Sequence, residues 1–527
     1  MERRDVITGA LTLVAAEGAR AADNTVRAAA PSPAATALER AARVTVARDE
    51  FLPGDVRRYG ASGDGTRDDS AAWRAAVSTG HRVLGGGPEH VYCLDAQVSL
   101  PRATIIDLQG ATIKPRGDTF AFVHPLPAPS AAAEVVRGAT QGSRVLTVQG
   151  GGPFRSGQWA HLICNDYPSH DASSYPPSWC RIVTVRGDAL ELDTPLQVGY
   201  GGQVHIAAYD AGVLCERIEC RNGVFDGSES TFDAGTGQAL RVGGAERVVV
   251  QGCEFRDFRH AGKLTCAVEL FTNVDASVSD CRFAGGVSQF DICDIQDARF
   301  AHFVNNQLAG SHFGCNITRA DFGLFANNSF QGRHAWEVAS GVSPARSVRG
   351  LKAYGCAAVR ILGNQATDYE SPIKVQACFR YDVSHNTIFN GGLGPYTGQI
   401  ALNVGSIARG LNMRDGRIVA NHVECCGGIG IGVSSDQPGG VCIANNVVRG
   451  TQAAGIHVNV ANAIICANRV EDWGLRSAGD AAIHAGERAS VVDNRFAHAT
   501  LTSLPCITGD AHLLARDNIS ESGNRLG

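Results

Sequence analysis

The sequence predicts an all-β protein whose main body is a parallel β-helix, a solenoid of short strands wound in successive turns. Three observations support this fold class. An Asn recurs at a spacing that returns to 22 residues. The segments between are short apolar–polar alternations broken by Gly, Asn or Asp, and none is a long amphipathic run. The 527 residues include 62 Gly and only 2 Met, which suits many short strands joined by tight turns.

The repeat is marked by an Asn followed two places later by an apolar residue. Stacking units of this kind buries the inward residues of each turn, or rung, against the next rung. We expect the Asn column to form an internal ladder of hydrogen-bonded amides with a structural role. The ladder positions are Asn306, Asn328, Asn364, Asn386, Asn421, Asn446, Asn468, Asn494 and, more loosely, Asn518, with Cys253 and Cys281 in the same place upstream.

Counting back from each ladder residue locates one face of the solenoid. Positions 13 and 11 before it are apolar or small, as in Val268 and Leu270, so they point inward and position 12 points outward. This first outward column reads Arg241, Glu269, Asp294, Asn316, Lys352, Lys374, Asn403, Gly432, His457, His484 and Thr508. The second outward column, two places on, reads Phe271, Gln296, Thr318, Tyr354 and Gln376.

The first column is either an ordinary solvated face or a binding groove. It holds acids on two successive rungs and lysines on two others, and adjacent rungs lie roughly 4.8 Å apart. Like charges at that distance are destabilising unless a metal, an opposite charge or a substrate compensates them. A groove tolerates this cost because its ligand supplies the compensation.

The segment before the repeats predicts a cap for the first rung. Residues 59–77 read YGASGDGTRDDSAAWRAAV, a glycine-rich loop followed by a helix that Asp69 or Ser70 can cap. Trp73 and Ala76 are expected on its buried side. Such a helix would cover the otherwise open edge of the solenoid.

This stretch closely resembles the N-terminal signature of the pectate-lyase-like superfamily, including its pectate lyase 3 and rhamnogalacturonase–epimerase-like domains. The resemblance implies a right-handed parallel β-helix from about residue 50 onward. It also implies an acidic polysaccharide as substrate, because the superfamily includes polysaccharide lyases, galacturonan hydrolases, alginate epimerases and phage tailspike depolymerases. The signature itself is structural, so its Asp64, Asp68 and Asp69 are not catalytic candidates.

The most favoured chemistry is β-elimination of a uronate, which needs charge neutralisation, a base and an acid. Glu269, Asp294 and Asn316 on consecutive rungs offer oxygen ligands suited to Ca²⁺, similar to calcium-using lyases of this fold. Lys352 and Lys374 each lower the pKa of the other and provide the base, and Tyr354 provides the acid. The expected substrate-binding residues are Arg241, Gln296, Gln376, Asn403 and His457.

Three alternatives stay open. A glycoside hydrolase would use Glu269 with Asp294, or Asp294 with Asp291 or Asp297, as acid and base. It ranks second because the motif set of galacturonan hydrolases, an NTD, a DD pair in a strand, GHG and RIK, is not present. A C5-epimerase would share the proton abstraction. A non-catalytic carbohydrate-binding or structural β-helix would need no acid–base residues at all.

The N-terminus resembles a twin-arginine export signal, with Arg3-Arg4 before an apolar stretch; a short cytosolic arm is the alternative. We expect an exported bacterial protein, periplasmic or secreted, that is a monomer or homotrimer. A net charge of −5 argues against nucleic-acid binding, and no later run is apolar enough to span a membrane. The expected divisions are a signal at 1–25, a linker at 26–48, the cap and first coils at 49–133, a β-rich insertion at 134–205 and the main coils at 206–527.

Two further expectations concern the insertion and the cysteines. Tyr167, His170, Tyr175 and Trp179 could rim a sugar groove or simply pack a loop. Cys356 and Cys378, two places after the second outward column on adjacent rungs, are expected to point outward within disulfide reach.

Overall fold

The computed structural model describes most of the chain from residue 35 to residue 526. The predicted signal, with Tyr167, His170, Tyr175 and Asp291, lies outside the described residues. The undescribed positions are 1–34, 102, 119, 165–177, 201–202, 231–236, 259–265, 285–291, 310–312, 333–348, 370, 392–399, 406–412, 414, 435–439, 477–479, 500–504, 510–512, 521–524 and 527.

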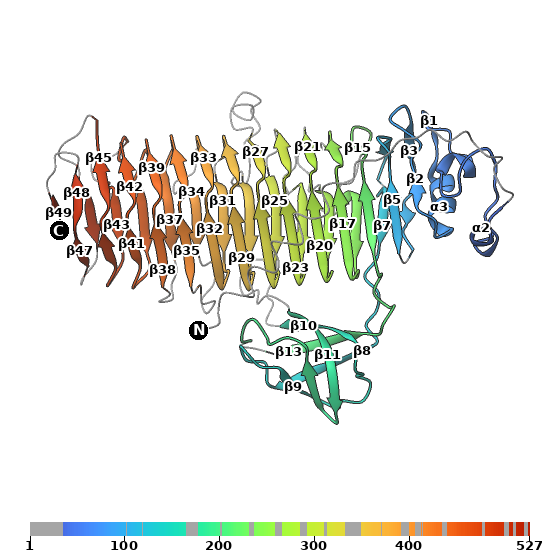
Figure 1. Ribbon diagram of the computed structural model, residues 1–527, viewed down its shortest axis with the longest axis horizontal. Coiled ribbons are helices and arrows are strands. Elements are labelled where there is room, and N and C mark those ends of the chain that lie inside the picture. The colour runs from blue at the N-terminus through green and yellow to red at the C-terminus, as the bar shows by residue number, and fades with distance from the viewer. Residues whose placement is uncertain are drawn as a thin grey trace, which may run out of the picture.

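The main body is a parallel β-solenoid whose turns each supply one strand to three long sheets (Figure 1). The all-β solenoid prediction is confirmed. Within the described residues the sheets hold 16, 14 and 13 strands and are called sheets 1, 2 and 3 below. No helix in this part of the chain is long and apolar enough to cross a membrane.

Sheet 1 is parallel throughout except for its last strand, β49, which pairs antiparallel with β48. Its strands are β1 (Asp64–Asp68), β3 (Val91–Leu94), β6 (Thr112–Pro115), β15 (Val224–Asp226), β18 (Glu254–Arg256), β21 (Arg282–Ala284), β24 (Gln307–Ala309), β27 (Ser329–Gln331), β30 (Gln365–Thr367), β33 (Thr387–Phe389), β36 (His422–Glu424), β39 (Val447–Arg449), β42 (Arg469–Glu471), β45 (Arg495–Ala497), β48 (Asn518–Ser520) and β49 (Arg525–Leu526).

Sheet 2 precedes sheet 1 in most turns of the solenoid. Its strands are β2 (Val83–Leu84), β5 (Thr104–Asp107), β14 (Ile218–Arg221), β17 (Arg247–Gln251), β20 (Asp275–Ser279), β23 (Phe300–Val304), β26 (Phe322–Ala326), β29 (Ala358–Leu362), β32 (Arg380–Ser384), β35 (Gly416–Val419), β38 (Val441–Ala444), β41 (Ile464–Cys466), β44 (Ser490–Val492) and β47 (Leu514–Arg516).

Sheet 3 carries the two outward columns predicted above. Its strands are β4 (Val98–Ser99), β7 (Phe122–His124), β16 (Gly237–Gly243), β19 (Cys266–Phe271), β22 (Cys293–Gln296), β25 (Phe313–Thr318), β28 (Arg349–Tyr354), β31 (Ser371–Gln376), β34 (Ile400–Gly405), β37 (Ile429–Ser434), β40 (Ile456–Asn459), β43 (Ile483–Ala485) and β46 (Ile507–Gly509).

The predicted Asn ladder is confirmed and runs inside the corner between sheets 2 and 1. Asn386 is typical: its Oδ1 accepts hydrogen bonds from the backbone N–H and the Nδ2 of Asn364, at 3.0 and 2.9 Å. Its own Nδ2 donates to the Oδ1 of Asn421, at 2.9 Å. The same pattern continues to Asn518, and upstream the backbone N–H of Cys281 joins it by donating to Asn306. The ladder therefore satisfies polar backbone groups that would otherwise be buried alone.

The N-terminal end is closed by the predicted helix, α3 (Ser70–Ser78). Trp73 is fully buried and packs 5.4 Å from the ring of Tyr92 and 5.3 Å from that of Phe122. Asp69 occupies the N-cap position, but its carboxylate accepts the backbone N–H groups of Ser62 and Gly63 instead. Asp69 therefore fixes the conformation of the glycine-rich loop through these two hydrogen bonds.

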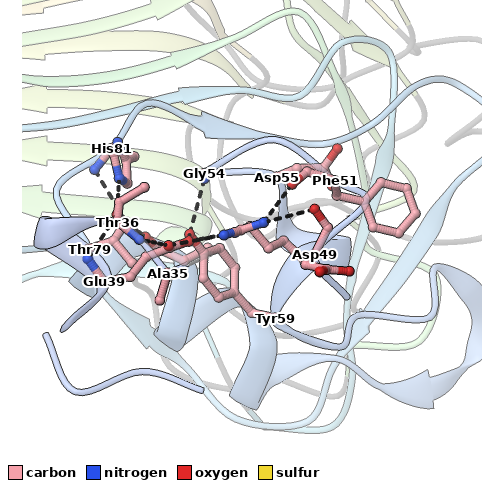
Figure 2. A network of polar contacts seen from close by, with 12 residues as sticks. Ala35, Thr36, Glu39, Asp49, Phe51, Gly54, Asp55, Tyr59, Thr79 and His81 are labelled. Atoms are coloured by element: carbon pink, nitrogen blue, oxygen red, sulfur yellow. Dashed lines mark hydrogen bonds and ion pairs between the residues drawn. The ribbon is translucent and has the colours of Figure 1, made fainter. Parts of the chain in front are cut away.

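Part of the region expected to be a linker folds onto this cap. Residues 35–48 include the short helix α2 (Ala37–Ala41), and the 3₁₀ helix η1 (Val56–Tyr59) follows. The fully buried Glu39 joins the two elements, accepting from Arg58 Nε at 2.6 Å and from the Tyr59 hydroxyl at 2.8 Å (Figure 2). Hydrogen bonding to Arg58 lowers the pKa of Glu39 to about 2, so the pair is ionised at neutral pH.

The insertion is a closed antiparallel barrel with its own apolar core, a few residues longer than the predicted 134–205 (Figure 1). Its strands are β8 (Ala131–Arg137), β9 (Val145–Val148), β10 (Trp159–Cys164), β11 (Ser178–Arg186), β12 (Ala189–Leu192) and β13 (Val204–Tyr209).

The barrel docks on the turns that lead from sheet 3 to sheet 2. Trp179 donates from its backbone N–H to Asp321 Oδ2 at 3.0 Å and from its indole Nε1 to the carbonyl of Asp297 at 2.8 Å. The hydroxyl of Ser178 donates to the other oxygen of Asp321 at 3.2 Å. Trp179 is only 1% exposed, so it packs the junction rather than rimming a groove.

The predicted outward position of Cys356 and Cys378 is wrong. Both side chains are fully buried in the solenoid core and stand as free thiols. Each follows a residue in the left-handed region, Gly355 (φ 61°) or Ala377 (φ 53°), which turns the chain at the end of the strand. The side-chain alternation that holds within β28 and β31 does not continue through this corner.

We expect Asn386→Ala to destabilise the solenoid by roughly 3 kcal/mol, because buried donors on Asn364 lose their acceptor. Chemical denaturation monitored by circular dichroism measures the midpoint. Gln365→Ala, at an exposed position of β30, is the control and should change stability by less than about 0.5 kcal/mol. Equal shifts for the two variants would contradict the structural role of the ladder.

We expect docking of the barrel to depend on pH through two opposing groups. Burial raises the pKa of Asp321 from 3.8 to about 7, so protonation strengthens docking as the pH falls through this interval. Burial lowers the pKa of His161, whose ring stacks on Trp179, from 6.5 to about 4, so its protonation weakens docking as the pH falls.

Single substitutions should separate these two effects. Asp321→Asn should undock on acidification from pH 6.5 to 4, whereas His161→Phe should dock more tightly over the same range. Small-angle scattering reports docking as a smaller radius of gyration. The same pH trend in both variants would refute this assignment.

Candidate functional site

The structure places the first outward column in register along sheet 3, as predicted. The paired positions, in order, are Arg241, Glu269, Asp294, Asn316, Lys352, Lys374, Asn403, Gly432, His457, His484 and Thr508. The second column, from Phe271 through Gln296, Thr318, Tyr354 and Gln376, continues to Gly405. These side chains, distant in sequence, therefore form two adjacent rows. Their proposed roles stay predictions.

The N-terminal end of the first column is an ion pair. Arg241 Nε donates to Glu269 Oε2 at 2.8 Å, and the guanidinium also lies 5.0 Å from the ring centroid of Phe271. Both charged side chains are half-buried. Arg241 is therefore engaged with its neighbour on the next rung, and so is one oxygen of Glu269.

Asp294 lies at the centre of a small amide cluster. It accepts a hydrogen bond from Gln296 Nε2 and another from Asn316 Nδ2, the latter at 3.2 Å. Asn316 also donates to the hydroxyl of Thr318 at 2.6 Å. The Oδ1 of Asn316 is buried and accepts no hydrogen bond from the described residues. One oxygen acceptor beside Asp294 is therefore left available.

The predicted calcium ligands fit a cation only in part. Asp294 and Asn316 face each other on adjacent strands, and the orphaned Asn316 Oδ1 is the kind of hard oxygen that Ca²⁺ prefers. Glu269 is instead paired with Arg241. Among the described residues no group of three or more His, Cys, Asp or Glu is arranged to hold a metal. A bound cation would therefore need ligands from a substrate or solvent.

The two lysines lie directly opposite each other on β28 and β31. Both are half-buried, and Lys352 Nζ lies 4.9 Å from the ring centroid of Tyr354. Tyr354 is only 4% exposed. The register partners on the two sides are neutral: Asn316 and Thr318 on β25, and Asn403 and Gly405 on β34.

The C-terminal part of the column contains a pair of imidazoles followed by Thr508. His457 and His484 stack with ring centroids 4.5 Å apart, and His484 Nδ1 lies 3.1 Å from the hydroxyl of Thr508. Burial lowers the pKa of His457, and the neighbouring His484 lowers it further. His457 lies three strands beyond Lys374, so it is too far along the solenoid to contact the same sugar unit as the lysine pair.

The barrel borders this site, which sequence reasoning missed. Its contacts with Asp297 and Asp321 fall on the turns that directly follow β22 and β25, the strands carrying Asp294 and Asn316. Arg380, the first residue of β32, donates to Gln197 Oε1 of the barrel at 2.7 Å. No periodic signal in the sequence marks these contacts, because each joins a single barrel residue to a single turn.

Comparisons with known proteins found similar solved structures. No family model matches the chain, and no curated protein matches it in sequence. Similar solved structures include the tailspike gp61 of Pseudomonas phage phi297, with 13% identity, a TM-score of 0.44 and coverage of 79% of this chain and 80% of that one.

Two further similar structures are bacterial. The surface adhesin PfbA of Streptococcus pneumoniae is 14% identical, with a TM-score of 0.44 and coverage of 90% of this chain and 95% of its own. The A-module of the mannuronan C-5 epimerase AlgE4 of Azotobacter vinelandii is 11% identical, with a TM-score of 0.36 and coverage of 88% and 95%. The parallel β-solenoid fold of this chain is shown by its own sheet topology.

Proposed function

We propose that this protein binds an acidic polysaccharide along the outer face of sheet 3 and cleaves it by β-elimination. The observation that carries the proposal is the pairing of Lys352 with Lys374 on adjacent strands. Two ammonium groups roughly one strand spacing apart concentrate positive charge on this face and attract an anion. A uronate carboxylate is such an anion, and a chain lying across the rungs presents several.

The lysine pair supplies both attraction and a base. Each ammonium disfavours protonation of the other, so one of the two amines can be neutral while the other binds the substrate carboxylate. The neutral amine removes the proton at C5, the carbon that bears the carboxylate. The C5–H electron pair then forms the C4–C5 double bond as the C4–O bond breaks.

The departing oxygen needs a proton, and we assign Tyr354 as its donor. Its ring lies against Lys352, and it shares a register position with Thr318 and Gln376. Gln376 and Asn403, both half-buried on the outer face, offer amide groups to sugar hydroxyls. Neutralisation, base, acid and hydroxyl contacts are thereby assigned to residues on three neighbouring strands, β28, β31 and β34.

Calcium would strengthen carboxylate binding at the neighbouring rungs. Asp294 and Asn316 would hold the cation, with oxygen ligands from the substrate completing its coordination. When bound, Ca²⁺ would neutralise the substrate carboxylate and so acidify the C5 proton. The residues named above would still carry out the proton transfers.

Hydrolysis is the second candidate, favoured by one observation: Glu269 and Asp294 face each other on adjacent strands. Their backbones lie roughly 4.8 Å apart, similar to the carboxylate separation of about 5–5.5 Å in retaining glycosidases. Against it, both carboxylates already accept hydrogen bonds, Glu269 from Arg241 and Asp294 from two amides. A C5-epimerase would use the same lysine base without breaking the C4–O bond.

We expect Lys374→Arg to lower kcat by about 10²–10⁴-fold while leaving KM within a few-fold, because arginine binds a carboxylate but cannot act as a neutral base. The ultraviolet absorbance of the unsaturated uronate ends measures the rate on a panel of uronate polysaccharides. Lys374→Ala should both lower kcat and weaken binding of the polysaccharide.

Arg360→Ala is the matched control for the lysine variants. Arg360 is exposed on β29, in the same turn as Lys352 but on a different sheet, so its loss should leave the rate unchanged. New reducing ends without unsaturated products would show that the site catalyses hydrolysis instead of β-elimination. No new ends of either kind in the wild-type protein would refute cleavage and leave binding or epimerisation.

We expect EDTA to lower the lyase rate and added Ca²⁺ to restore it. Asp294→Asn should raise the Ca²⁺ concentration needed for half-maximal rate by about tenfold or more, since a charged ligand is lost. Glu269→Gln should change it far less, because Glu269 is paired with Arg241. An EDTA-insensitive rate would remove calcium from the proposal without affecting the lysine pair.

A further inference from the structure

A pocket lies outside the lysine column, where the barrel meets the solenoid. Its volume is about 70 Å³, and its walls include Trp179, Cys180, Leu196, Arg299, Asp321 and Phe322. The barrel supplies the first three of these residues and the solenoid the last three. This volume is well below the roughly 300 Å³ of a typical small-molecule pocket, so it suits one substituent of a larger ligand.

An aromatic platform stands at this pocket. Phe322 is 36% exposed and stacks on Phe300 of the preceding strand, with ring centroids 5.4 Å apart and planes within 18°. Exposed aromatic rings of this kind offer a flat apolar surface to the C–H face of a sugar ring. A saccharide ring can therefore stack on Phe322 while one of its substituents enters the pocket.

Arg299 provides hydrogen-bond donors in the pocket wall. Its guanidinium lies over the rings of Phe300 and Trp159, at 5.5 and 5.7 Å from their centroids. Its described hydrogen bonds are long: Nη1 to Asp193 and Nη2 to Thr194, each at 3.4 Å. A guanidinium has five N–H donors, so donors remain for a ligand oxygen.

Asp321 provides an acceptor at the same pocket. Its buried carboxylate accepts one hydrogen bond from Trp179 and one from Ser178. A carboxylate has about four lone-pair positions, so acceptor capacity remains. Burial raises the pKa of Asp321 to about 7, so at pH 8 the group is mostly the ionised carboxylate. At that pH a second anion beside it would be repelled, so the ligand group should be neutral and should carry an N–H donor.

We propose that this pocket binds the acetamido group of an N-acetylated sugar whose ring stacks on Phe322. Arg299 donates to the amide carbonyl, Asp321 accepts from the amide N–H, and the methyl group lies against Leu196 and Cys180. A carboxylate lacks the N–H and would be repelled by Asp321, and an O-acetyl group lacks the donor. The site is separate from the lysine column and does not depend on cleavage.

Saturation-transfer NMR at pH 8 with two probes tests the proposal directly. Methyl N-acetyl-β-glucosaminide should receive saturation at its acetyl methyl, whereas methyl β-glucoside, which lacks the acetamido group, should receive little. Phe322→Ala should weaken binding of the first probe about tenfold through loss of the stacking surface. Phe322 is partly exposed, so we expect this variant to fold.

Two control variants separate this site from others. Phe389→Ala removes an aromatic ring that is 48% exposed on β33 of sheet 1, and it should leave binding unchanged. Lys374→Ala should also leave it unchanged while abolishing cleavage. Equal saturation of both probes, no saturation of either, or unaltered binding in Phe322→Ala would each overturn the proposal.

Discussion

A buried column of asparagine amides holds the rest of this structure in register. Each ladder Asn offers its Oδ1 to the backbone N–H and the amide of the Asn one rung earlier, as Asn421 does for Asn386. A rung shifted by one residue would leave these buried groups unpaired and would turn its inward side chains to solvent. Every outward column, including the one that carries the lysines, therefore inherits its alignment from the ladder.

The ladder also explains how the solenoid tolerates turns of unequal length. Successive ladder residues are separated by 22 positions between Asn306 and Asn328 but by 36 between Asn328 and Asn364. The strands on both sides of the longer interval still pair in register, with Asn316 opposite Lys352. The longer interval therefore leaves the register of the described strands of sheet 3 unchanged.

This periodic order decides what the sequence can predict. The ladder, the outward columns and the buried face of α3 could be predicted because each follows from a repeat or from strand alternation. Cys356 was misplaced because alternation was extended past Tyr354 into a corner where Gly355 is left-handed. The barrel junction could not be predicted, since Trp179 and Asp321 are 142 positions apart and meet once, without a repeating signal.

The charges of the site are arranged by rung rather than scattered over the face. Arg241 forms an ion pair with Glu269. The side-chain amides of Gln296 and Asn316 donate hydrogen bonds to Asp294, so both acidic groups have donors on the same face. Beyond Asn316 the column changes to two facing lysines followed by a neutral amide. A polyanion bound along the axis would therefore meet a different charge at each end of this segment. Because the ladder fixes the order of the rungs, the polarity of a bound chain would be fixed as well.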